Sequence, residues 1–362
     1  MSNLIFQTLK ELPIPLFQSQ CLLHKHELLI CGGWNEKACY SYHTIKNEYK
    51  FICEYPSHVK VEGHCVVKLV HNNHKDNNQI TLLSFGSNWD GENKHTLAMK
   101  YVSVWSNISN KSNEFNNYNQ WIPFTDNHNH PIIIGKYNGH YHGARAVIGG
   151  SNNHLLFITY LENNISVFDL NTFQFIKHDI LPTIDYINYH CFVSNSENGQ
   201  VQEIVKTNEE KNKHIYQMLL FCFETGLSIE YDEDNNTFQF NELPVCNDIE
   251  SFFRYAYVCV NDKIFFFGGI GNFVYSKSVH VYSIRESKWI TFQNTLPSPL
   301  FGCVAIFSEE DNDIHIIGGR DDKETTSKNE IKLIVQYWTR TLQIKFGWIS
   351  YFDKIIMKYK MK

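Results

Sequence analysis

Four histidines in one short segment are the clearest candidates for metal chemistry in the chain. His128, His130, His140 and His142 lie within residues 126–143, DNHNHPIIIGKYNGHYHG. Imidazole nitrogens bind zinc and copper when several of them converge. A metal site also needs groups that orient the imidazoles, and no carboxylate pattern accompanies these four. The sequence therefore predicts exposed loop histidines, with no metal site and no cofactor.

Motifs for covalent or phosphate chemistry are missing from the sequence. The chain has no GxSxG nucleophile turn, no GxxxxGK[ST] phosphate loop, no HExxH zinc motif and no dinucleotide fingerprint. The acidic runs at 231–234 and 309–313 are typical of solvated turns. We therefore expect no catalytic residues.

Charge and cysteine content narrow the class of protein. The 362 residues carry a net charge of −6, which argues against a general nucleic-acid binder. Lys10 and Glu11 interrupt the apolar N-terminal run, so no secretory signal is predicted, and no run of 18 uncharged apolar residues is present. Ten cysteines without a CxxC pair then indicate reduced, mostly buried thiols in a cytoplasmic protein.

A repeated pattern of glycine pairs and paired aromatic residues organises the chain. Apolar runs end in glycine at LLICGG (28–33), LLSFGS (82–87), IFFFGG (264–269) and IHIIGG (314–319). After most of them, two aromatic residues follow seven positions apart, separated by hairpin-turn residues. Each unit is therefore predicted to be a meander of four antiparallel strands, a to d. The residues of this structural motif are Gly32, Gly33, Tyr42, Tyr49, Gly86, Phe168, Phe175, Tyr231, Phe238, Gly268, Gly269, Tyr282, Trp289, Gly318 and Gly319.

This double glycine followed by two aromatics resembles the kelch-repeat family, in particular a large set of protist kelch-motif proteins with an ending like QYWTRTLQIKFGWISYFDKII. The resemblance implies an all-β, six-bladed kelch-type β-propeller, because residues 3–326 give six units of 54 residues each. The propeller is expected over residues 1–326, with the N-terminal LIFQTLKELP closing the last blade. That blade is expected to be incomplete, because strand c with its aromatic is missing after IHIIGG. Blades 2, 3 and 4 also depart from the glycine pattern.

Residues 327–362 are predicted to form a basic amphipathic helical tail. Ser327 and Glu330 have the spacing of a helix-capping box, and apolar residues then recur mostly every three or four positions. Residues 331–362 hold seven basic residues and one acidic residue, a net of +6, so the remainder carries −12. The tail is expected either to bind an anionic membrane surface or a partner groove, or to pack on the acidic propeller.

Loops on one side of the propeller are the candidate binding surface. In a four-stranded meander, the b–c and d–a loops share one side of the ring, and aromatic and Arg residues are frequent anchors of interfaces. The candidate residues are Trp34, Asn35, Trp89, Tyr141, Tyr186, Arg254, Tyr255, Phe273 and Arg320.

The sequence thus predicts a non-catalytic protein–protein interaction module or scaffold, with no nucleic acid partner. The alternatives are an enzyme with a pocket at the central channel, as in galactose-oxidase-like folds, or a peripheral membrane adaptor that uses the tail. The resemblance allows actin or a cytosolic complex as the protein partner. The copper site of galactose oxidase has no residue-by-residue match here.

Overall fold

Six four-stranded antiparallel sheets make up the fold. The computed structural model describes residues 6–70, 79–106, 117–135, 139–194, 214–292, 294–310, 312–323, 325–326 and 330–334. Five sheets are each built from consecutive stretches of chain, and the sixth combines strands from opposite ends of the sequence.

The strands are as follows. Sheet 1 contains β2 (Gln20–His24), β3 (Glu27–Gly33), β4 (Glu36–His43) and β5 (Glu48–Glu54). Sheet 2 contains β6 (Cys65–Leu69), β7 (Gln79–Gly86), β8 (His95–Val102) and β9 (Ile122–Pro123). Sheet 3 contains β10 (Arg145–Gly149), β11 (Leu155–Tyr160), β12 (Asn164–Asp169) and β13 (Gln174–Ile180). Sheet 4 contains β14 (Cys191–Ser194), β15 (Ile215–Cys222), β16 (Thr225–Asp232) and β17 (Thr237–Glu242).

Sheet 5 contains β18 (Ala256–Val260), β19 (Lys263–Phe267), β22 (Val279–Ser283) and β23 (Lys288–Thr291). A short hairpin of β20 (Ile270–Gly271) and β21 (Val274–Tyr275) interrupts it between β19 and β22. Sheet 6 contains β24 (Val304–Ser308), β25 (Asp313–Ile317), β26 (Glu330–Ile334) and β1 (Phe6–Thr8), in that order.

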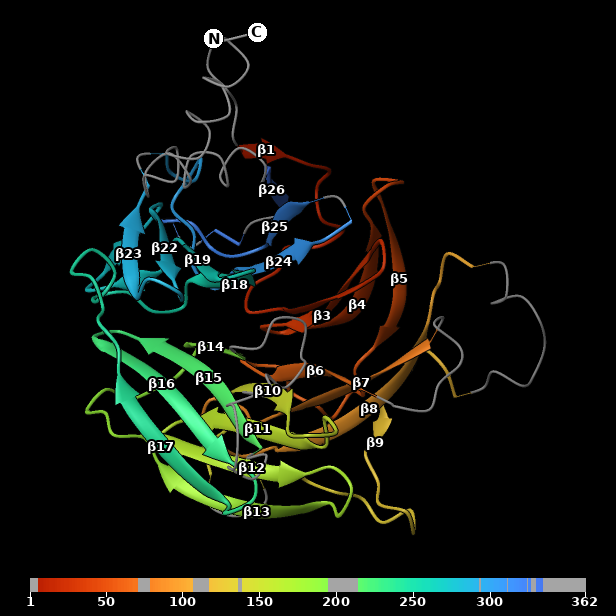
Figure 1. Cartoon of the computed structure of the whole chain (residues 1–362). Helices are drawn as coiled ribbons and strands as arrows, with labels where there is room; N and C mark the ends of the chain where they lie inside the picture. Colours follow the sequence, from red (N-terminus) through yellow and green to blue (C-terminus); the bar gives the residue numbers. More distant parts are fainter. Residues whose placement is uncertain are drawn as a thin grey trace, which may run out of the picture.

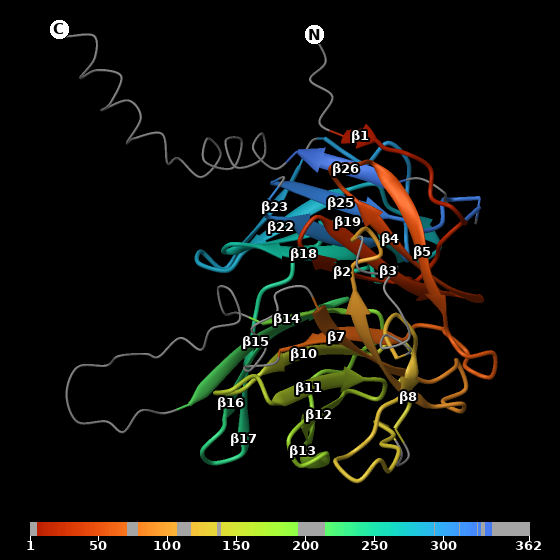
Figure 2. The ribbon, with the colours of Figure 1, turned by 90° about the vertical axis from the view of Figure 1, so that its right-hand side faces the viewer.

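The sheets surround a common axis, with the first strand of each on the inside, and this arrangement is a β-propeller (Figures 1 and 2). Its five blades of consecutive strands are sheets 1 to 5. Six hydrophobic clusters each join two neighbouring sheets. Leu28 and Ile30 of sheet 1, for example, pack with Ile317 of sheet 6. The inner strand β24 contacts both β18 and β2, so sheet 6 lies between sheets 5 and 1.

The paired aromatic residues occupy directly opposite positions on strands c and d, as the sequence predicts. Tyr282 is the register partner of Trp289, and their ring centroids lie 5.2 Å apart. The other three pairs are also register partners, with centroid distances of 4.7 Å for Tyr42–Tyr49, 5.1 Å for Phe168–Phe175 and 4.9 Å for Tyr231–Phe238. Aromatic pairs of this kind fill the space between packed sheets.

The glycine pair at the end of strand b is required by close backbone contact. Gly318 has a φ of +66°, and a Cβ atom there would lie 3.1 Å from the backbone carbon of Leu16. Gly319 has a φ of +99° and donates its N–H to the Leu16 carbonyl at 2.8 Å. The pair therefore lets the loop before sheet 1 cross directly over the end of β25.

Sheet 6 corrects two expectations about the end of the chain. The strand c that seemed missing is β26, in which Ile331 is the register partner of Ile316 and Leu333 that of Ile314. The capping-box spacing at Ser327 and Glu330 therefore does not begin a helix, and the sheet extends beyond the expected boundary at residue 326. A short apolar run fits both a helical and a strand period, and here the open edge of β25 decides between them. The rest of the expected tail, residues 335–362, lies outside the described residues.

The N-terminal strand β1 lies at the outer edge of sheet 6, in the position expected for the closing strand (Figure 1). Phe6 is the register partner of Leu333, and its side chain packs in the cluster that joins sheets 5 and 6. The described residues form strands, turns and loops without an α-helix, and so contain no helical membrane span. All ten cysteines are free thiols, and six of them are buried.

Candidate functional site

A ring of six residues in left-handed backbone conformation surrounds the mouth of the central channel. Each lies in a d–a loop, two positions before the innermost strand of its sheet, and each has a φ between +50° and +72°. Glycine adopts this conformation readily, whereas other residues adopt it at a cost. The six residues of this mouth ring are Gln18, Gly63, Gly143, Tyr189, Arg254 and Gly302.

Backbone hydrogen bonds connect the mouth ring from sheet to sheet. Gly143 donates to the Gly63 carbonyl at 2.8 Å, and Tyr189 donates to the Gly143 carbonyl at 2.9 Å. On the other side, Gly302 donates to Arg254 and Gln18 donates to Gly302, both at 2.8 Å. These bonds need the left-handed turn at each position, which explains why three side chains are held there in a conformation that they disfavour.

The three glycines of the mouth ring make room for large neighbouring side chains. A Cβ atom on Gly143 would lie 2.8 Å from the ring of Tyr189, and one on Gly63 would meet the same ring and its hydroxyl. The Tyr189 hydroxyl donates to Gln18 Oε1 at 2.8 Å and lies 2.8 Å from His142 Nε2. Since its single proton goes to Gln18, His142 Nε2 is the donor in the second bond. Burial lowers the pKa of His142 to about 4, with a further contribution from the charge of Arg254, so the imidazole is neutral at pH 7.

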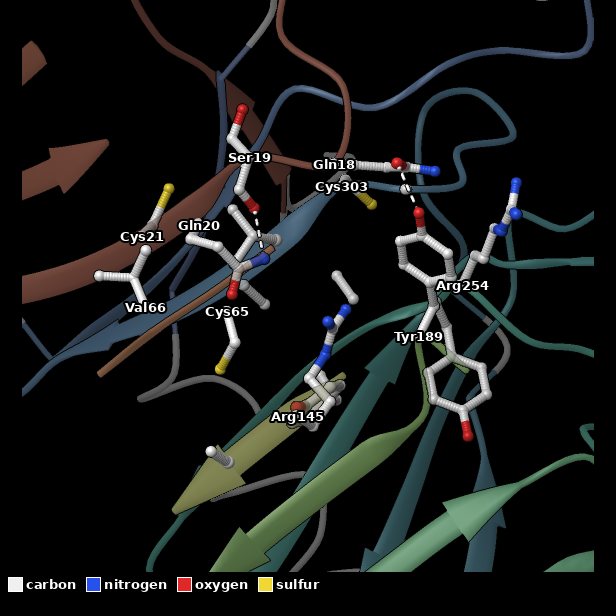
Figure 3. A pocket seen from close by; sticks show the side chains of 17 residues that line it. Gln18, Ser19, Gln20, Cys21, Cys65, Val66, Arg145, Tyr189, Arg254 and Cys303 are labelled. Atoms are coloured by element: carbon white, nitrogen blue, oxygen red, sulfur yellow. Dashed lines mark hydrogen bonds between the residues drawn. The ribbon is translucent and has the colours of Figure 1, made fainter. Parts of the chain in front are cut away.

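A cavity of about 200 Å³ lies at this mouth. Figure 3 shows Gln18, Tyr189 and Arg254 at one side of it and Arg145 reaching in from β10. Residues of the innermost strands line the rest, and its lining includes Cys21, Cys65, Val66, Ala146, Ala256, Cys303, Val304 and Ala305.

Arg145 and Arg254 both lie against Tyr189, which stands between them (Figure 3). The guanidinium carbon of Arg254 lies 4.5 Å from the centroid of the Tyr189 ring and 5.2 Å from that of Phe253. That of Arg145 lies 5.5 Å from the Tyr189 centroid. Burial, and then the charge of Arg320, lower the pKa of the Arg254 guanidinium. Burial also raises the pKa of the thiols of Cys65 to about 11 and of Cys303 to about 12, so both are protonated at pH 7.

A row of contacting aromatic rings runs along the same face. Phe17 packs edge-on against Phe301 with centroids 5.3 Å apart, and Phe301 lies 5.3 Å from Tyr275 of β21. On the other side, Phe17 lies 6.4 Å from Trp34, and the Arg320 guanidinium stacks over Phe17 at 4.2 Å. Two predicted residues, Trp34 and Arg320, thus meet through Phe17, which the sequence analysis missed.

The predicted binding residues divide into exposed and buried groups. Phe273, at the tip of the β20–β21 hairpin, is 97% exposed, and Trp89 and Tyr186 are 65% and 69% exposed. Asn35 is also exposed, whereas Trp34, Arg254 and Arg320 are half-buried.

Tyr141 and Tyr255 are buried and correct the expectation that they are available to a partner. Tyr141 stacks on Tyr160 with centroids 4.3 Å apart, and the Tyr255 hydroxyl donates to the Phe221 carbonyl at 2.7 Å. Both rings therefore fill space between the loops and the sheets below them.

The histidine segment contains a carboxylate beside two of its histidines, although the sequence indicated no carboxylate pattern around the four. One side-chain atom from each of Asp126, His128 and His130 lies within 4.8 Å of the others. Asp126 Oδ1 accepts the backbone N–H groups of His128 and His130 at 2.8 Å, and Oδ2 lies 3.0 Å from His130 Nδ1. These bonds shape a tight exposed turn, while His140 and His142 lie elsewhere, against Trp89 and Tyr189.

Gln18, Arg145 and Tyr189 are the site residues that sequence reasoning missed. A signal for them exists in the alignment of the six segments before strand a: QSQ (18–20), GHC (63–65), GAR (143–145), YHC (189–191), RYA (254–256) and GCV (302–304). Glycine in three of them marks the left-handed position, and the other three segments place Gln, Tyr and Arg at the same point.

No protein-family model matches the chain, and no curated protein matches it in sequence. Among solved structures it is similar to that of YjhT, with a TM-score of 0.56 and 13% identity over 89% of this chain and 95% of that chain. At this level of identity the likeness shows the fold alone. The chain is therefore a protein of the β-propeller class.

Proposed function

We propose that this propeller is a non-catalytic protein-interaction module that binds its partner on the face formed by the b–c and d–a loops. A propeller fold carries many unrelated functions, so the proposal rests on the surface and not on the fold. The observation that carries it is the gathering of exposed apolar side chains on that face.

Six of the twelve large apolar residues that are exposed among those described lie on the b–c or d–a connections that form this face. They include the two most exposed, Phe273 at 97% and Ile184 at 93%. Scattered exposed apolar residues are ordinary, but a set on one face favours a docking surface. The six residues of this exposed set are Trp89, Ile133, Ile184, Tyr186, Phe273 and Val274.

The groups around the mouth cavity support binding rather than a chemical step. General bases and nucleophiles work best with pKa values near the working pH. Here the pKa values of Tyr189, Cys65 and Cys303 are raised by burial, and that of His142 is lowered by it. None of these four groups has a pKa near neutrality, as a general acid or base would need. They therefore do not support the alternative of an enzyme at the central channel.

The repeat itself supports a six-bladed propeller of the kelch type. Its glycine pairs and its four aromatic pairs resemble those of the kelch motif, and the mouth ring repeats the same turn in all six sheets. On this proposal sheet 6 is the sixth blade. The partner is a cytoplasmic protein, with actin or a cytosolic complex as the candidates that the resemblance allows.

Affinity capture with matched variants tests the docking face. The double variant Trp89→Ala/Phe273→Ala removes two exposed rings from the face, and Ile45→Ala, which is 65% exposed on a c–d loop of the opposite side, is the control. We expect mass spectrometry to find proteins that wild type and the control retain and that the double variant loses. Equal retention by all three proteins would contradict the proposal.

A further inference from the structure

The mouth cavity holds positive charge without a balancing carboxylate. Arg145 and Arg254 line it, and no ion pair found among the described residues includes either of them or Arg320. Glu62 is the carboxylate whose charge acts on Tyr189, and its Oε2 is buried without a hydrogen-bond partner among the described residues. It forms no ion pair there with Arg145 or Arg254, so the two guanidinium groups that line the cavity leave the mouth with a net positive charge.

Arg145 lies near the axis of the propeller. Burial lowers the pKa of the imidazoles of His64 and His190, and the charge of Arg145 contributes to the lowering at both; these two histidines precede the inner strands of two different sheets. Among the described residues, the Arg145 guanidinium donates one hydrogen bond, to the neighbouring Ala144 carbonyl at 2.9 Å. Most of its five N–H donors therefore meet no acceptor in the described part of the chain and are available to a ligand.

Buried polar atoms without partners lie beside this charge. Gln18 Nε2, Ser19 Oγ and Arg254 Nε are all buried and have no hydrogen-bond partner within the described ranges. Gln18 and Ser19 are only 4% and 6% exposed, and both line the cavity. Buried polar groups in proteins are nearly always paired, so three unpaired ones around one cavity indicate a missing acceptor.

The backbone holds these groups at a cost. Gln18 and Arg254 have φ values of +56° and +53°, at positions where three other sheets carry glycine. Strain that persists at a cavity mouth, where glycine would relieve it, points to a use for the side chains.

The size and walls of the cavity define the rest of the ligand. At roughly 30 Å³ for each water molecule, 200 Å³ has room for about seven non-hydrogen atoms. Val66, Ala146, Ala256, Val304 and Ala305 form apolar walls beside the cationic groups.

We propose that the mouth cavity binds a carboxylate on a short apolar stem, with Arg145 and Arg254 supplying the charge and Gln18 and Ser19 further hydrogen bonds. The carboxylate comes either from a free short-chain acid or from a glutamate side chain of a partner. In both cases the apolar stem packs against the alanine and valine walls, and the oxygens take up the unpaired donors.

Binding of defined probes to the purified chain tests this without any protein partner, so its outcome is separate from that of the capture experiment. Pentanoate has seven non-hydrogen atoms, and pentanamide is its neutral isostere. We expect calorimetric or ligand-observed NMR titration to show pentanoate binding at least about tenfold more tightly than pentanamide, as loss of charge-assisted hydrogen bonds requires. A second titration compares acetyl-Ala-Glu-Ala-amide with its Gln analogue. If the chain prefers the Glu peptide but does not prefer pentanoate to pentanamide, the carboxylate belongs to a glutamate side chain of a partner.

Variants locate the site. Arg145→Met should weaken the binding of pentanoate at least about tenfold, and Arg254→Met should weaken it likewise. Arg285→Met, which removes an exposed cation from a c–d turn on the opposite face, should leave it unchanged. If Arg145→Met unfolds the chain, the comparison of acid with amide in wild type still decides. Equal binding of acid and amide, binding of neither the acids nor the Glu peptide, or unchanged binding in both cavity variants would overturn the proposal.

Discussion

Replacing Gly63 by alanine should destabilise the propeller through Tyr189. The new Cβ would lie 2.8 Å from Gly143 N and would meet the Tyr189 ring and hydroxyl. A non-glycine residue in left-handed conformation costs about 1–2 kcal/mol. Displacing Tyr189 would also break its hydrogen bonds to Gln18 and His142, each worth about 1 kcal/mol. Together these losses amount to about 3–4 kcal/mol.

Gly91→Ala is the matched control for this variant. Gly91 also has a positive φ, of +81°, but its Cβ would approach only the half-buried side chain of His140, at 3.0 Å. Gly91→Ala should therefore lower the free energy of unfolding only by the cost of the left-handed backbone conformation, about 1–2 kcal/mol. Equilibrium unfolding in urea measures the stability of both variants. We expect the free energy of unfolding to be about 2 kcal/mol lower for Gly63→Ala than for Gly91→Ala.

A second background sharpens the test. In a Tyr189→Phe chain the hydroxyl and both of its hydrogen bonds are already gone, so Gly63→Ala should cost less there than in wild type. Equal costs for Gly63→Ala and Gly91→Ala, or strictly additive costs of Gly63→Ala and Tyr189→Phe, would refute the reasoning that Tyr189 needs the glycine.

Three further predictions concern the sheets. A double-mutant cycle with Tyr282→Ala and Trp289→Ala should give a coupling of about 0.5–1.5 kcal/mol in urea unfolding, and zero coupling would contradict their cross-strand contact. Burial lowers the pKa of His95 to about 4, so protonation favours the unfolded chain, and His95 should by itself lower the free energy of unfolding by about 1.4 kcal/mol for each unit that the pH falls from 6.5 to 4. His95→Gln should flatten this part of the profile of unfolding free energy against pH, and an unchanged slope would exclude His95 as its source. Phe6→Ala should lower the free energy of unfolding by about 3 kcal/mol through lost packing between sheets 5 and 6, whereas Thr8→Ala, at an exposed position of the same strand, should lower it little in the same assay. Similar values for the two variants would show that the Phe6 ring does not anchor β1.

The repeat was predictable because its contacts are local. Tyr282 and Trp289 lie seven positions apart across one hairpin, so the sequence places them together without knowledge of the rest of the chain. The glycine pairs could be read from the sequence because they recur at the ends of apolar runs, although the contact that requires Gly318 and Gly319 comes from Leu16 at the other end of the chain.

The last sheet and the mouth cavity were not predictable in the same way. The strand β26 pairs with β1, whose position at that edge depends on closure of the whole ring. Gln18 and Tyr189 share one backbone position with Arg254, which the sequence analysis named, but the three side chains have no chemical type in common, so composition does not reveal the shared position. Tyr255 was expected at the surface because it lies on a d–a loop, but its hydroxyl donates a hydrogen bond to the Phe221 carbonyl of the neighbouring sheet.

The composite make-up of sheet 6 has a consequence for biogenesis. Among the described strands, β1 leaves the ribosome first and β26 last, so more than three hundred residues are synthesised before β1 can pair with β26. Contacts so distant along the chain are slow to form. The pairing of β1 with β26 is therefore the last step in closing the propeller, and the same pair of strands is where we expect the ring to open first.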